Sequence, residues 1–121
     1  MSETAPREWR LYIDDMIRFT ERAMAYTAGL TRVSFVANPL IYDATLRNLE
    51  LIGEAATKIP DPLRAANAAI PWRQIVATRN RLIHGYLGID DDTIWSIIET
   101  DLPRLIVRLR QFDGTQEDPR S

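Results

Sequence analysis

The sequence of 121 residues contains no cysteine and only one histidine, His84. Without cysteine, the chain has no disulfide bonds, no thiolate metal ligands and no cysteine nucleophile. Zinc sites rely on histidine and cysteine, and a single imidazole would leave such a site to carboxylates alone. We therefore expect neither a metal ion nor another cofactor.

Long apolar runs are also absent. No uncharged stretch approaches the ~18 apolar residues that a membrane-spanning helix needs. The N-terminal residues MSETAPRE lack an apolar stretch and are charged early, which is not the pattern of a secretory signal. Hydrophobic residues make up 45% of the chain and charged residues 26%, as in a globular protein. We expect a cytoplasmic protein with one domain over residues 1–112, a polar, disordered tail over residues 113–121, and no membrane partner.

Lysine is scarce: the chain has fourteen arginines and one lysine, Lys58. The formal net charge is −2, which argues against broad, charge-driven binding of nucleic acid, and we expect no DNA partner. Arg73, Arg79 and Arg81 nevertheless lie close together in the sequence, near the histidine. A localised positive patch is therefore compatible with the acidic chain.

What the sequence does contain is helical periodicity. Apolar residues recur at the spacing of an amphipathic helix, and no segment alternates with the period of two that is typical of strands. Asn38-Pro39 and Asp61-Pro62 are start signals for helices, and Gly29 and Gly85 are stop signals. We predict helices over residues 6–28, 39–59, 63–69, 71–84 and 91–112, the last capped by one of Asp90, Asp91 and Asp92 and kinked at Pro103. The predicted fold is an all-α, antiparallel up-and-down bundle of four to five helices.

The segment RNRLIHGY, residues 79–86, is the candidate functional site. Arg79 lies on the same stripe of its helix as Leu82 and Ile83, and Tyr86 follows seven residues later, within about 20° of Arg79 around the axis. A guanidinium at a core position costs roughly several kcal/mol unless a carboxylate, a ligand or a subunit interface receives it. His84 on its own is more often a structural residue, and its neighbours are what make it a candidate.

These residue types suit the cleavage of RNA without a metal. An imidazole with a pKa near ~6.5 exchanges protons at cellular pH, and a guanidinium binds phosphate oxygens. On a regular helix, however, His84 lies about 140° around and ~7.5 Å along the axis from Arg79. One histidine also cannot act as base and acid in the same displacement. We therefore predict a homodimer in which two chains share one site.

Three blocks of the sequence resemble the HepT-like toxins of the HEPN superfamily of helical ribonucleases. They are LRNLELIGEAATKIP, IPWRQIVATRNRLIHGYLGID and IWSIIETDLPRL, which include the Arg-x4-His-x-Tyr signature of that family. The resemblance implies a HEPN-like fold and a metal-independent endoribonuclease, the dimeric toxin of a type VII (HEPN/MNT) toxin–antitoxin system. It implies that Arg79 and His84 are catalytic and that Asn80 and Tyr86 support them. It also implies a minimal nucleotidyltransferase (MNT, or MntA-like) antitoxin as partner, which attaches AMP to Tyr86.

Other residues keep structural interpretations beside functional ones. Asn48 is treated as a supporting residue, a core amide bound either to a backbone group or to Arg79. Glu54 falls on the opposite side of its helix from Asn48, and solvated surface is its simplest interpretation. Trp72 and Trp95 are expected to serve packing or a dimer interface, and Tyr86 is equally compatible with closing the bundle.

Two other functions remain open beside the toxin. The chain could be a non-catalytic helical subunit that binds a minimal nucleotidyltransferase. It could also be a purely structural bundle in which Arg79 is the partner of an internal ion pair.

Overall fold

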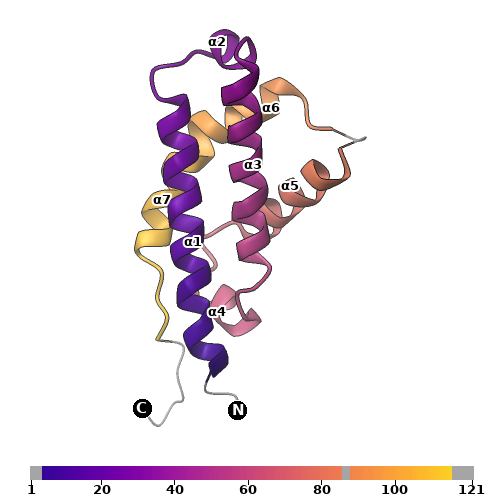
Figure 1. Cartoon of the computed structure of the whole chain (residues 1–121). Coiled ribbons are helices and arrows are strands. Elements are labelled where there is room, and N and C mark those ends of the chain that lie inside the picture. Colours follow the sequence, from indigo (N-terminus) through magenta and orange to yellow (C-terminus); the bar gives the residue numbers. More distant parts are fainter. Residues whose placement is uncertain (1–3, 86–87, 116–121) are drawn as a thin grey trace.

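The computed structural model describes residues 4–85 and 88–115, and within these ranges every regular element is helical (Figure 1). The elements are α1 (Thr4–Thr27), α2 (Arg32–Val36), α3 (Pro39–Ala56), α4 (Asp61–Ala66), α5 (Trp72–His84), α6 (Asp91–Ser96), the π-helical turn η1 (Ile97–Asp101) and α7 (Leu102–Arg110). The predicted all-α, HEPN-like bundle is confirmed. Most of the predicted C-terminal tail lies outside the described residues.

The long helices α1 and α3 run side by side, and α7 packs against α1. Their shared core contains the fully buried side chains of Met16, Phe35, Ile52, Ile94 and Leu109. Helix α5 is attached differently: it packs against α3 and leans away from the α1–α3 pair (Figure 1). Its only buried residue is Trp72 at its first position, so most of α5 is available to form a surface site.

The predicted starts of α3 and α6 and the predicted end of α5 are confirmed, because capping is local chemistry, whereas α3 and α4 each end three residues earlier than predicted. The Asn38 side chain accepts a hydrogen bond from the Ile41 N–H at 3.1 Å, and Asp90 accepts one from the Thr93 N–H at 2.7 Å. Gly85 ends α5 with a φ of +69°, a conformation that favours glycine. Helix α4 begins two residues earlier than predicted, directly after Pro60.

Helix α2 differs from the prediction, which treated the segment after Gly29 as an irregular connection. Thr31 and Ser34 form a capping box, in which each side chain receives a backbone N–H of the other residue. The box starts a short helix that inserts Phe35 into the core, where the ring packs against Tyr42 and Trp95. The packing role expected of Trp95 is thereby seen within one chain.

The last predicted helix is divided into α6, η1 and α7. The irregularity lies just before Pro103, as expected of a helix that contains proline. The Leu102 N–H donates to the Ile97 carbonyl, one residue further back than in an α-helix. Ile98 and Leu102, which both precede the proline, are buried in the core. In residues 4–85 and 88–115, no helix has both the length and the apolar character needed to cross a bilayer.

Candidate functional site

The candidate site is built where α5 lies closest to α3. Gly53 of α3 faces Arg79 of α5 so closely that a Cβ on Gly53 would stand 2.2 Å from the Arg79 Cβ. The same Cβ would stand 3.0 Å from the Ile75 carbonyl oxygen. Only glycine fits, and the aliphatic part of Arg79 lies directly on the α3 backbone as a result.

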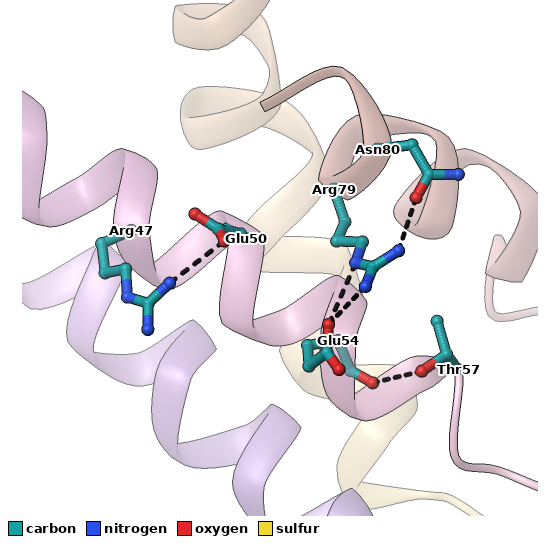
Figure 2. A network of polar contacts seen from close by, with 6 residues as sticks. All are labelled: Arg47, Glu50, Glu54, Thr57, Arg79 and Asn80. Carbon is teal, nitrogen blue, oxygen red and sulfur yellow. Dashed lines mark hydrogen bonds and ion pairs between the residues drawn. The ribbon is translucent and has the colours of Figure 1, made fainter. Parts of the chain in front are cut away.

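The guanidinium of Arg79 is held by two side chains, one from each helix (Figure 2). Oε1 of Glu54 accepts hydrogen bonds from Nη2 of Arg79 at 2.6 Å and from Nε at 3.0 Å. Nη1 of Arg79 donates to Oδ1 of Asn80 at 2.7 Å. The side chains of Arg79 and Glu54 remain 26% and 45% exposed, so the pair lies at the surface and not inside the bundle.

These contacts leave part of the guanidinium available. Arginine carries five N–H groups, and Glu54 and Asn80 receive three of them. Among the described residues, no acceptor takes the second N–H of either Nη nitrogen of Arg79, and two such groups are what a two-point contact with a phosphate uses. The geometry therefore fixes Arg79 and still permits it to bind an anion.

Glu54 is the residue that the sequence interpretation missed. The sequence leaves its role open, with solvated surface as the simplest interpretation; the side chain is 45% exposed, and its carboxylate is also the ion-pair partner of Arg79, which the sequence does not indicate. The predicted placement on the side of α3 away from Asn48 is consistent with this pairing. The available signal was Gly53, since a glycine inside a helix indicates where another element approaches closely.

Asn48 lies elsewhere. Its side chain is buried, with 6% of the residue exposed, and Nδ2 donates to the Ala44 carbonyl oxygen of its own helix at 2.8 Å. The structure thus bears out the first of the two predicted partners, a backbone group, and does not join Asn48 to Arg79. Oδ1 of Asn48 is buried without a hydrogen-bond partner among the described residues.

His84 is the last residue of α5, and its side chain is exposed. Because α5 is regular between the two residues, His84 stands about 7.5 Å along the axis and about 140° around from Arg79. The helix ends directly after it, as predicted. Tyr86, the predicted supporting and AMP-accepting residue, lies outside the described residues.

A hollow on α5 opens beside Asn80, and none of the described residues that line it carries a carboxylate. Its lining consists of Thr57, Arg64, Trp72, Arg73, Val76, Ala77 and Asn80. Two hydrogen bonds from Nε1 of Trp72, to the carbonyl oxygens of Arg64 and Asn67, fix that ring in the fold, as its predicted packing role requires. Arg73 is exposed, so a positive side chain borders the hollow next to the Arg79–Asn80 contact.

Each aspartate of the acidic run 90–92, at the start of α6, has a structural partner. Asp90 caps the helix, Asp91 accepts a hydrogen bond from the Tyr42 hydroxyl at 2.6 Å, and Asp92 pairs with Arg32 at 3.3 Å. The hydrogen bond that Tyr42 donates to Asp91 raises the pKa of Tyr42 to about 12. The predicted helix cap is confirmed, and no cluster of three potential metal ligands occurs among the described residues.

Comparison with known proteins gives consistent matches over most of the chain. A family model described as ribonuclease HepT-like matches residues 16–112. A protein of Methanocaldococcus jannaschii that is named as an RNase is 32% identical over 99 residues, which cover 82% of this chain and 91% of that protein. A protein of Thermococcus cleftensis named "Probable ribonuclease HepT" is 31% identical over 99 residues, covering 82% and 90%.

A further similar protein, from Caldanaerobacter subterraneus subsp. tengcongensis and also named as an RNase, is 30% identical over 103 residues, covering 85% of this chain and 92% of its own. No solved structure matches the chain at a comparable level. The helical bundle and the family match over residues 16–112 identify the class of protein as a HepT-like ribonuclease. The resemblance seen in the three sequence blocks is thereby confirmed. The chain belongs to the HepT-like ribonuclease family.

Proposed function

We propose that this protein is an endoribonuclease that cleaves RNA without a metal ion, at a site shared by two copies of the chain. The observation that carries the proposal is the guanidinium of Arg79, which Glu54 and Asn80 hold while one N–H on each Nη nitrogen remains. His84, the only imidazole of the chain, ends the same helix. The family membership supports the same activity.

In the proposed reaction, a base takes the proton of an RNA 2′-hydroxyl, and the oxygen bonds to the adjacent phosphorus. The bond from phosphorus to the 5′-oxygen breaks, and an acid gives that oxygen a proton. The products are a 2′,3′-cyclic phosphate and a free 5′-hydroxyl. Arg79 stabilises the charge that develops on the phosphorane oxygens.

The proton transfers require a second chain. A single imidazole cannot remove one proton and deliver another at opposite ends of the same displacement. Two copies related by a two-fold axis would bring two His84 and two Arg79 side chains to one cleft. We therefore include the homodimer in the proposal.

We further propose that the ribonuclease is the toxin of a type VII system and that a minimal nucleotidyltransferase antitoxin silences it by attaching AMP to Tyr86. An added phosphate with its adenosine, seven residues from Arg79 in the sequence, would compete for the same guanidinium and repel RNA. Intact mass measurement after co-expression with the transferase tests this step. A mass increase that Tyr86→Phe abolishes supports it, and an increase that persists in this variant contradicts it.

The cleavage itself is tested with purified protein, RNA and EDTA. We expect cleavage that leaves cyclic-phosphate ends and that His84→Ala abolishes, together with a mass in solution of two chains. Cleavage that continues unchanged in His84→Ala contradicts the mechanism. Absence of cleavage by the wild-type dimer, with a stable complex with the transferase, would favour the non-catalytic subunit.

A further inference from the structure

We propose that Glu54 is a positioning residue for RNA cleavage, which orients the guanidinium of Arg79 toward the scissile phosphate. This inference rests on the proposed function, because it assigns Glu54 a part in that reaction. It concerns a residue outside the Arg-x4-His-x-Tyr segment. The proposal therefore adds a residue of α3 to a site whose arginine and histidine both lie on α5.

The restraint on Arg79 acts on the plane of the guanidinium. Nε and Nη2 lie on one edge of that plane, and both donate to the same oxygen of Glu54, at 3.0 and 2.6 Å. Asn80 receives Nη1 at 2.7 Å. The stem of the side chain is fixed separately by its close approach to Gly53. Together these contacts fix the arginine at its base, along one edge and at its tip.

A carboxylate beside a catalytic arginine could instead be an inhibitor that competes with the phosphate. The number of donors argues for positioning, because one N–H on each Nη nitrogen is still available. The two roles also predict opposite effects. If Glu54 competes with phosphate, its neutralisation raises the rate of cleavage or tightens RNA binding. If Glu54 positions Arg79, its neutralisation lowers kcat and leaves KM nearly unchanged, since the ground-state attraction of RNA to Arg79 remains.

The chain offers a matched control on the same helix. Glu50 lies one turn before Glu54 and pairs with Arg47 at 3.0 Å (Figure 2). Both residues of that pair belong to α3, so the Glu50–Arg47 ion pair does not connect α3 to α5. The Arg47 side chain is 62% exposed. Glu50→Gln therefore removes the same charge from the same helix without releasing Arg79.

The first experiment compares Glu54→Gln, Glu50→Gln and wild type in steady-state cleavage of an RNA oligonucleotide, with thermal melting of each. For Glu54→Gln we expect kcat to fall by at least about tenfold, because small misplacements of a catalytic group have effects of this order. We expect KM to stay within about twofold. Glu50→Gln should behave as wild type.

An unchanged or increased kcat in Glu54→Gln would overturn the proposal, as would an equal fall of kcat in Glu50→Gln. A second readout does not need activity. In an NMR spectrum of arginine side chains, with Arg79→Lys to assign the signal, the Arg79 Nε–H should exchange slowly with water in wild type and in Glu50→Gln, and rapidly in Glu54→Gln.

Exchange that is the same in Glu54→Gln and wild type would also overturn the positioning role. If wild-type protein does not cleave RNA while this exchange difference is present, the proposed function fails and Glu54 is assigned only to holding Arg79. The two failures are therefore distinguishable.

Discussion

The Cα of Gly53 on α3 lies so close to the side chain of Arg79 on α5 that any larger residue at position 53 would displace the arginine. A Cβ at position 53 would stand 2.2 Å from Cβ of Arg79, 2.9 Å from Cγ of Arg79 and 3.0 Å from the Ile75 carbonyl oxygen. These atoms belong to the backbone or lie next to it and cannot swing away. Gly53 therefore sets the distance between α3 and α5 and also fixes the position of the candidate catalytic residue Arg79.

Gly53→Ala should separate α3 from α5 and misplace Arg79. The better helix propensity of alanine, worth about 1 kcal/mol, opposes an overpacking cost of about 1–3 kcal/mol. We expect a modest net loss of stability, measured by urea unfolding, and a loss of RNA cleavage larger than that destabilisation explains. Asp43→Ala, an exposed substitution on the same helix, is the control. Full activity in Gly53→Ala would show that the close approach is not needed.

Arg79→Ala separates catalysis from structure. Because the side chains of the ion pair are 26% and 45% exposed, the pair should stabilise the fold by no more than about 1 kcal/mol. We expect a soluble dimer that melts close to wild type and does not cleave RNA. If the variant instead unfolds, Arg79 is an internal structural partner and the structural-bundle hypothesis is correct.

Arg73→Glu tests whether the carboxylate-free hollow beside Asn80 accommodates the RNA strand. The positive charge of Arg73, which lines this hollow, should attract RNA phosphates next to the scissile phosphate without taking part in the reaction. We expect weaker binding of RNA to the uncleaving His84→Ala protein, with the slope of log K against log salt reduced by about one contact. Arg22→Glu makes the same charge change on α1 and is the control, so equal weakening in both variants would exclude a localised subsite.

The helices and their caps were predictable because the chemistry that starts and ends a helix is local. Asn38, Asp90 and Gly85 act on backbone groups within one turn of themselves. Helix α2 escaped the prediction because it is a single short helix, whose capping box has serine where glutamate or glutamine is usual.

The partner of Arg79 was not predictable from helical periodicity. A helical wheel places Glu54 opposite Asn48 but does not say which helix passes that side of α3. The answer depends on how α3 is rotated in the bundle and on the close approach at Gly53, 26 positions before Arg79. The need for a partner was visible from Arg79 on its stripe, whereas the identity of that partner is a property of the packed structure.

The hydrogen bond between Tyr42 and Asp91 makes stability depend on pH in the alkaline range. The hydroxyl donates to Asp91, which raises the pKa of Tyr42 from 10.0 to about 12 and so favours the protonated phenol in the folded chain. The resulting stabilisation is complete below pH 10 and is lost as the pH rises toward 12, because the folded state then loses a proton that it binds more tightly than the unfolded chain does. Tyr42→Phe lacks this proton. In thermal melts, the difference in melting temperature between wild type and Tyr42→Phe should therefore decrease as the pH rises from 10 toward 12. A constant difference in melting temperature between the two proteins from pH 9 to 12 would contradict the assignment.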